Sequence, residues 1–185
     1  MKSDASVLTI IEVINRLALP YMVTGSLASN TYGIERATKD ADFVLQSAED
    51  SISRLSKALE PPLQMDPQAT FETITGTTRF IIRAGKSFKI EIFILSDDPH
   101  DQERFRRRKK GMVENQPVWL PTAEDVIITK LRWSKQGKRT KDTDDVRNVI
   151  AVQDNLLDWD YIHRWCDQHG TRDLLEQIRR DLPGR

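Results

Sequence analysis

Thr24-Gly25-Ser26-Leu27-Ala28-Ser29 and, after ten intervening residues, Asp40-Ala41-Asp42 are the most informative segments of this sequence. Tyr21–Thr24 has the composition of a short buried strand, and a helix is predicted over Leu27–Tyr32. Glycine permits a tight turn between them, and the helix start offers N–H groups and the positive end of a dipole. Such a turn is a ready phosphate site, although a Gly-Ser pair between a strand and a helix is more often a simple turn.

Asp40 and Asp42 are two residues apart at the start of an apolar run that predicts a strand over Asp40–Leu45. Side chains at this spacing project from the same face of a strand. Two adjacent carboxylates repel each other unless a cation joins them, and Mg²⁺ takes oxygen ligands of this kind. The alternative is an exposed strand edge with two solvated acids, but aspartate is depleted in strands, so its presence there needs a reason.

A third acid, Glu91, lies in the most clearly alternating segment, Phe88–Leu95. Phe88, Ile90, Ile92 and Ile94 are predicted on one face of that strand, with Glu91 on the other. If this strand is a neighbour of Asp40–Leu45, three carboxylates converge and two divalent ions could bridge them. Considered by itself, Glu91 is an outward-facing surface acid.

Together these features resemble the nucleotidyltransferase superfamily of polymerase β-like fold. The resemblance implies that the Gly-Ser turn and the segment before the two aspartates bind a nucleoside triphosphate, through Gly25, Ser26, Arg36 and Thr38. It implies that Asp40, Asp42 and Glu91 hold Mg²⁺ or Mn²⁺ and that Glu91 helps to activate the attacking hydroxyl. Aspartate is usual at the third position, so Glu91 departs from the family pattern.

A second pattern begins at Leu120–Asp125, which opens a helix that carries Lys130, and continues with Arg139-x-Lys141-Asp142-x-x-Asp145. It is similar to the AbiEii-type branch, the toxin components of abortive-infection toxin–antitoxin systems and related stand-alone proteins. That resemblance implies a catalytic Lys130 that contacts nucleotide phosphates, Asp142 or Asp145 that orients Lys130 or the nucleotide, and a cognate antitoxin partner. Without it, Lys130 is a surface lysine, and the aspartates are acids favoured near a helix N-terminus.

The 185 residues include 28 basic and 28 acidic side chains, a net charge of zero that hides an uneven distribution. Residues 86–141 hold 14 basic and 8 acidic side chains, a net charge of +6. The densest run, residues 104–110, can attract phosphates and suggests RNA or tRNA as a partner, the alternative being a solvated face. A single cysteine, Cys166, excludes an internal disulfide framework. No apolar run reaches the roughly 18 residues of a membrane helix, so we expect no membrane partner and a cytoplasmic location.

The expected fold class is α+β: a nucleotidyltransferase (polymerase β-like) mixed sheet flanked by helices, with a helical C-terminal part. Residues 1–120 are predicted to form the catalytic core and residues 121–185 a helical part packed on it. Helices are expected from a cap at Ser3 or Asp4 up to Pro20, and over 48–59, 123–134, 142–151, 158–168 and 171–181. Strands are expected at 71–74 and 79–83 around a turn at Gly76, with short extended pieces over 112–120.

The functional prediction is a Mg²⁺-dependent nucleotidyltransferase that moves a nucleoside monophosphate from an NTP to an acceptor hydroxyl on RNA, tRNA or protein. A more specific prediction is that the protein is the toxin of an abortive-infection toxin–antitoxin system. Two alternatives stay open. One is a catalytically inactive nucleotidyltransferase-like protein that binds a nucleotide or a partner. The other is an antibiotic nucleotidyltransferase acting on an aminoglycoside or a lincosamide.

Overall fold

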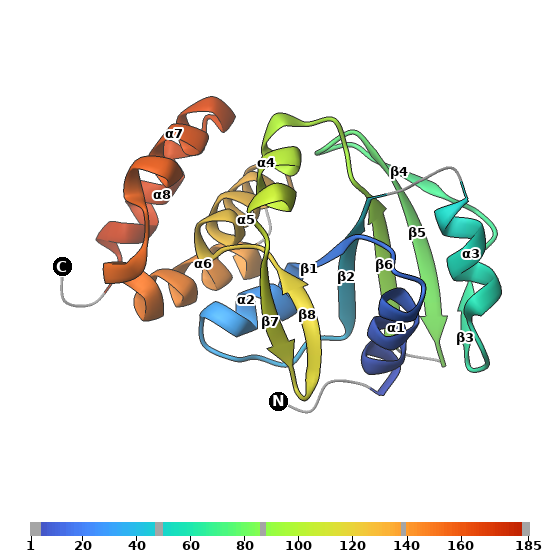
Figure 1. Ribbon diagram of the computed structural model, residues 1–185. Helices are drawn as coiled ribbons and strands as arrows, with labels where there is room; N and C mark the ends of the chain where they lie inside the picture. The colour runs from blue at the N-terminus through green and yellow to red at the C-terminus, as the bar shows by residue number, and fades with distance from the viewer. Residues whose placement is uncertain (1–4, 47–49, 86–87, 138–139, 183–185) are drawn as a thin grey trace. The chain divides into compact units, whose positions relative to one another are not determined.

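A computed structural model of the chain describes residues 5–46, 50–85, 88–137 and 140–182, and Figure 1 gives the element labels. By compactness the chain divides into a first unit, residues 1–27 and 37–121, and a second unit, residues 28–36 and 122–185. The proposed domain division after residue 120 stays a prediction.

The first unit is built on a mixed sheet. Its elements, in chain order, are α1 (Ala5–Arg16), β1 (Tyr21–Thr24), β2 (Asp40–Leu45), α3 (Ser51–Ala58), β3 (Leu63–Met65), β4 (Thr70–Glu72), β5 (Thr77–Ala84), β6 (Phe88–Ile94), α4 (Pro99–Arg107), β7 (Lys109–Val113) and β8 (Gln116–Leu120). The strand order is β1-β2-β6-β5-β3, with β4 paired to β5 and with β7 and β8 forming a separate hairpin. β2 pairs antiparallel with β1 and parallel with β6, so the strand of the two aspartates lies inside the sheet.

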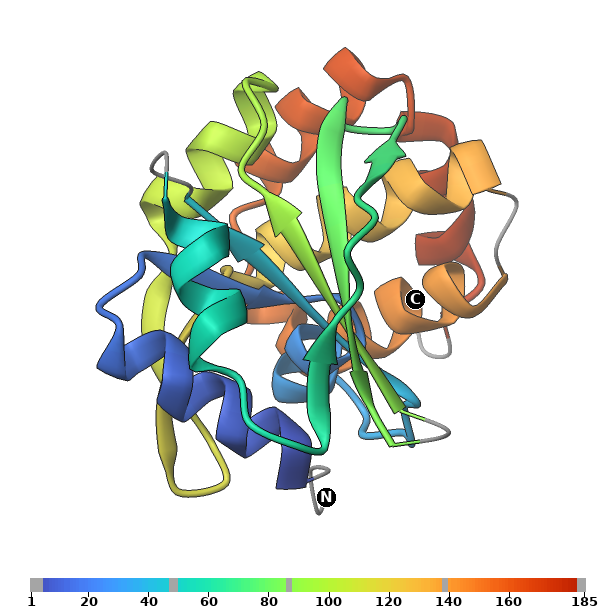
Figure 2. The same cartoon turned by 90° about the vertical axis from the view of Figure 1, so that its right-hand side faces the viewer.

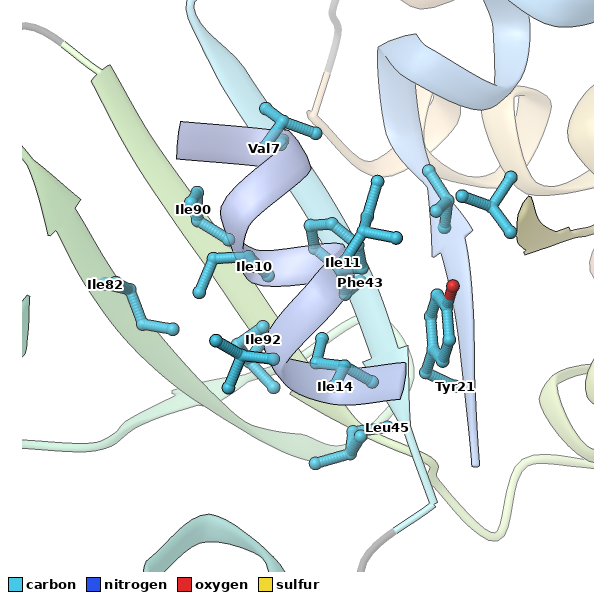
Figure 3. Close-up of a cluster of buried hydrophobic side chains, with 14 of the residues drawn as sticks. Val7, Ile10, Ile11, Ile14, Tyr21, Phe43, Leu45, Ile82, Ile90 and Ile92 are labelled. Carbon is cyan, nitrogen blue, oxygen red and sulfur yellow. The ribbon is translucent and has the colours of Figure 1, made fainter. Parts of the chain in front are cut away.

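Helices α1 and α3 cover one face of this sheet (Figure 2). Val7, Ile10, Ile11 and Ile14 recur at the spacing of one helix face and are almost completely buried. They pack against the alternate residues of β2, β5 and β6 that share their side of the sheet, as Figure 3 shows: Phe43, Leu45, Ile82, Ile90 and Ile92. Because strand side chains alternate, this packing places Asp40, Asp42 and Glu91 on the opposite face.

Two elements of the first unit were not predicted. The short strand β3 pairs with β5, and α4 occupies the first part of the basic run. Helix α4 has a local cause, since the Asp98 carboxylate accepts hydrogen bonds from the N–H groups of His100 and Asp101 and Pro99 stands at the first helical position. The predicted N-terminal cap at Ser3 or Asp4 and the start of the predicted helix 48–59 lie outside the described residues.

The second unit is helical, as expected. Its elements are α5 (Ala123–Gly137), α6 (Thr140–Gln153), the 3-10 turn η1 (Asp154–Leu156), α7 (Trp159–His169) and α8 (Arg172–Arg180). Helix α2 (Gly25–Tyr32) begins in the first unit and ends in the second. Buried apolar side chains from α5 to α8 form its core, and burial raises the pKa of the Cys166 thiol to about 11. The fold class is therefore confirmed as α+β with a mixed sheet and C-terminal helices. None of the helices over the described ranges is long and apolar enough to cross a membrane.

Candidate active site

The turn at Gly25 lies against the carboxylate of Asp42. Thr24 ends β1 and is the register partner of Asp42 on β2, so the two strands bring the turn and the carboxylate together. Gly25 has a φ of +63°, and a Cβ atom there would lie 1.9 Å from Oδ2 of Asp42. Only glycine fits this position without displacing the carboxylate. Helix α2 begins at Gly25, two residues earlier than predicted, which makes the buried Ser26 part of its first turn.

Asp40 and Asp42 lie on one face of β2, and both are partly exposed. The Thr38 hydroxyl donates a hydrogen bond of 2.7 Å to Oδ1 of Asp40. In this structure Thr38, which the resemblance assigns to nucleotide binding, orients the first carboxylate. Two carboxylates on one strand face beside a glycine turn are an oxygen-rich donor set of the type that Mg²⁺ or Mn²⁺ takes. These two residues therefore fit a divalent ion.

Glu91 is the register partner of Asp42 across the parallel β2–β6 pair and shares its face of the sheet. Its carboxylate forms ion pairs with two cations, because Lys89 Nζ lies 2.7 Å and Arg79 Nη1 lies 3.5 Å from Oε1. In the described part of the chain, no three acidic, histidine or cysteine side chains are grouped closely enough to hold a metal ion. The structure thus places the three acids on adjacent positions of one sheet face but joins Glu91 to Lys89 and Arg79.

A second charged cluster, in the second unit, connects α5, α6 and the segment after α2. Lys130 Nζ lies 3.0 Å from Oδ1 of Asp142 and 2.7 Å from Oδ2 of Asp145. Arg36 binds Asp145 with two parallel hydrogen bonds, of 2.7 Å from Nε and 2.8 Å from Nη2. Two cations and two anions give this cluster a net charge of zero.

Burial and charge act in opposite directions on Asp145. Burial alone would raise the pKa of its carboxyl, but the hydrogen bond from Arg36 and the charge and hydrogen bond of Lys130 together lower that pKa below its ordinary value. Lys130 is 7% exposed and both aspartates are 2% exposed. Lys130 is therefore not the surface lysine of the alternative interpretation.

Arg36, which the resemblance assigns to nucleotide binding, also has a structural role that the sequence patterns do not indicate. Its backbone N–H and C=O are both bonded to the Asn30 side chain, and its guanidinium is committed to Asp145, 109 positions away. The spacing of residues along the sequence cannot predict an ion pair between Arg36 and Asp145, because they are brought together only by the tertiary fold. Arg139, which the second pattern includes, lies outside the described residues.

The basic run 104–110 is not one exposed patch. Arg104 is buried and donates hydrogen bonds of 2.7 Å to the Asp101 carboxylate and 3.2 Å to the Thr24 hydroxyl. It therefore stabilises the end of β1 before the glycine turn. Arg108 stacks on the ring of Phe105 at 3.9 Å, and partial burial lowers its pKa. The prediction that the six basic residues of this run can attract phosphates is thus wrong for Arg104, because a count of charges takes no account of an internal ion pair.

Comparison with known proteins gives no match of the sequence to a protein-family model or to a curated protein. Solved structures do match. The antibiotic-resistance factor ANT(2'')-Ia aligns with a TM-score of 0.61 at 13% identity, covering 96% of this chain and 98% of that one. A nucleotidyltransferase-like antigen from Paracoccidioides brasiliensis aligns at 0.58 and 15% identity, covering 96% and 92%. The chain has the nucleotidyltransferase fold. The lincosamide adenylyltransferase LnuA shares it, at a TM-score of 0.56 and 10% identity over 81% of this chain and 98% of that one.

Proposed function

We propose that this protein is a divalent-metal-dependent nucleotidyltransferase that transfers a nucleoside monophosphate from an NTP to an acceptor hydroxyl. The observation that carries the proposal is the close approach of Gly25 to Asp42, because it places the start of helix α2, where N–H groups can bind phosphate, directly beside a carboxylate that can hold a divalent ion. The nucleotidyltransferase fold supports it.

In the proposed reaction, Ser26 and the N–H groups at the start of α2 bind the triphosphate. Asp40 and Asp42 hold Mg²⁺ or Mn²⁺, which when bound would neutralise charge on the phosphate oxygens. The acceptor oxygen forms a bond to the α-phosphorus while the bond from that phosphorus to the bridging oxygen breaks, and pyrophosphate leaves. Glu91 receives or orients the hydroxyl proton.

In the cluster of Lys130, Asp142, Asp145 and Arg36, Lys130 could act on the nucleotide or serve only stability, and an experiment can separate these two roles. Asp142 and Asp145 lie within 3.0 Å of Lys130 Nζ, which supports a role in orienting it. We propose that Lys130 contributes positive charge toward the nucleotide phosphates and that Arg36 holds Asp145 in place. If Lys130 is instead purely structural, Lys130→Met lowers stability without changing the KM for NTP.

The finer version of the proposal is a toxin of the AbiEii type, paired with an antitoxin protein and acting in the cytoplasm on RNA or tRNA. Its support is the Lys130–Asp142–Asp145 pattern. A second candidate is antibiotic modification. ANT(2'')-Ia is known in complex with adenylyl-2''-tobramycin and LnuA with lincomycin, and both have this fold.

The test is incubation with each labelled NTP, Mg²⁺, total cellular RNA, total protein, and an aminoglycoside and a lincosamide in separate reactions. The proposal predicts Mg²⁺-dependent transfer by the wild type and none by Asp42→Asn. The matched control is Asp66→Asn, which removes a carboxylate of the same unit that is hydrogen-bonded to Arg83 instead. Equal labelling by the wild type and Asp42→Asn would contradict the proposal, and so would no labelling of any acceptor.

A further inference from the structure

Two solvent-accessible cations flank Glu91 on the face of the sheet that carries the aspartates. Arg79 on β5 and Lys89 on β6 share that face with Glu91, because Arg79 pairs with Phe93 and Lys89 is two residues from Glu91. The Arg79 and Lys89 side chains are 30% and 51% exposed, whereas the Glu91 side chain is 10% exposed. The carboxylate is therefore nearly covered while its two cations still face solvent.

The charges along this face are ordered by strand. Asp40 and Asp42 on β2 contribute −2, which is the charge that one divalent ion cancels. Next to them, Lys89 and Arg79 with Glu91 give a net charge of +1. The following cation on β5, Arg83, is balanced by Asp66 through two hydrogen bonds of 3.0 and 2.9 Å. The excess positive charge thus lies beside the acid that would receive the acceptor proton.

We infer that Arg79 and Lys89 form an anion subsite for the acceptor, and that the acceptor is a hydroxyl with a phosphate close by, as at the ribose end of an RNA strand. This inference rests on the proposed function. A guanidinium binds phosphate oxygens in pairs, and an ammonium adds a point charge, so the two together suit a phosphodiester. A polycationic aminoglycoside would meet like charge at this position, which favours the phosphate-bearing acceptor.

The subsite also differs from the RNA contact that the basic run 104–110 suggests. In that run Arg106, Lys109 and Lys110 are exposed, and Arg104 is buried in its pair with Asp101. The two surfaces therefore use different residues, and variants can assign binding to one or the other.

The experiment titrates a fluorescent single-stranded oligoribonucleotide with a free 3′ hydroxyl against the wild type, Arg79→Gln and Lys89→Gln, by anisotropy at increasing salt. Each variant leaves Glu91 with its other cation, and thermal unfolding checks that both are folded. We expect each to weaken binding about tenfold and to reduce the slope of log affinity against log salt by about 0.7, the value for one lost single-strand phosphate contact. Arg83→Gln is the matched control, because it removes a more exposed cation of the same strand that Asp66 already balances, and it should bind like the wild type.

Two results would overturn the inference: wild-type affinity in both Arg79→Gln and Lys89→Gln, or an equal loss in Arg83→Gln. A loss confined to a Lys109→Gln, Lys110→Gln double variant would also overturn it and would assign RNA binding to the basic run.

Parallel transfer assays separate this inference from the proposed function. Transfer to an aminoglycoside or a polypeptide, with no RNA binding through Arg79 and Lys89, refutes the subsite and upholds the function. RNA binding through both residues, with no transfer to any acceptor, upholds the subsite and refutes the function.

Discussion

The two clusters of charged side chains differ in access and in composition. Asp40 and Asp42 are partly exposed on one strand face, with a hydroxyl donor from Thr38 and a glycine turn beside them. Asp142 and Asp145 are almost fully buried, and their charge is matched by Lys130 and Arg36. Because the aspartates of the first cluster are accessible and those of the second are buried, substitution of an aspartate should mainly change chemistry in the first cluster and mainly change stability in the second.

The largest expected effect is that of Asp42→Asn on transfer. Losing one of the two carboxylates proposed to hold the metal should lower the rate at least a thousandfold, or roughly 4 kcal/mol of transition-state stabilisation. The free energy of unfolding should stay within about 1 kcal/mol of the wild type, because Asp42 is partly exposed. Single-turnover kinetics and urea unfolding measure the two quantities. A large loss of stability would show that the β2 aspartates are structural, and the contrast between the clusters would disappear.

Asp145→Asn should show the reverse behaviour. Lys130 keeps Asp142 but loses its shorter contact, and Arg36 loses both hydrogen bonds to the carboxylate, which together should cost about 3 kcal/mol of folding free energy. Urea unfolding at pH 7 measures this loss. The control is Asp144→Asn, the neighbouring aspartate, which is exposed and ion-paired with Arg147 and should cost less than about 1 kcal/mol.

The pH dependence of stability tests the same residue. The pKa of Asp145 is lowered in the folded state, so the unfolded chain binds the proton more readily. The carboxylate therefore stabilises the protein above its unfolded-state pKa of about 3.9, and that stability is lost as the pH falls below it toward the folded-state pKa. The difference in unfolding free energy between the wild type and Asp145→Asn should shrink between about pH 5 and pH 2. A constant difference over this range would contradict the ion-pair assignment.

Gly25→Ala is expected to have an intermediate effect on both quantities. Its left-handed φ costs an alanine about 1–2 kcal/mol, and its Cβ atom would displace the Asp42 carboxylate. The rate of transfer should fall about a hundredfold, because the Asp42 carboxylate is displaced but not removed. This loss is smaller than the one expected for Asp42→Asn. Gly85→Ala separates the two causes, because Gly85 has a φ of +65° with open space around its Cβ position. Equal activity of the two alanine variants would remove the argument for a ligand at the turn.

The parts that could be predicted are those with a local pattern. Alternation along β6 and the two-residue spacing of Asp40 and Asp42 correctly predict the face of the sheet on which these side chains lie. The capping sequence at Asp98 and Pro99 is also local and would have predicted α4.

What the sequence could not predict depends on pairs that are distant along the chain. The Arg36–Asp145 pair and the contacts of Glu91 with Arg79 are made by tertiary packing. Arg104 shows the limit of a charge count, since its partner Asp101 cancels it inside the fold. Residue type alone therefore overstates how many cations of a basic run are available to a partner.

The smallest expected effect is that of Thr38→Val, and it separates two roles of one hydroxyl. If Thr38 orients Asp40, as the 2.7 Å hydrogen bond indicates, losing the bond costs about 1 kcal/mol. The Mg²⁺ concentration for half-maximal transfer should then rise about fivefold, while the KM for NTP at saturating Mg²⁺ stays unchanged. If Thr38 binds the nucleotide directly, as the family resemblance implies, the KM for NTP rises instead and the Mg²⁺ requirement does not. The control is Thr38→Ser, which keeps the hydroxyl and should show the wild-type Mg²⁺ dependence. If the serine variant instead behaves like the valine variant, the methyl group of Thr38 matters at this position and the hydrogen bond does not.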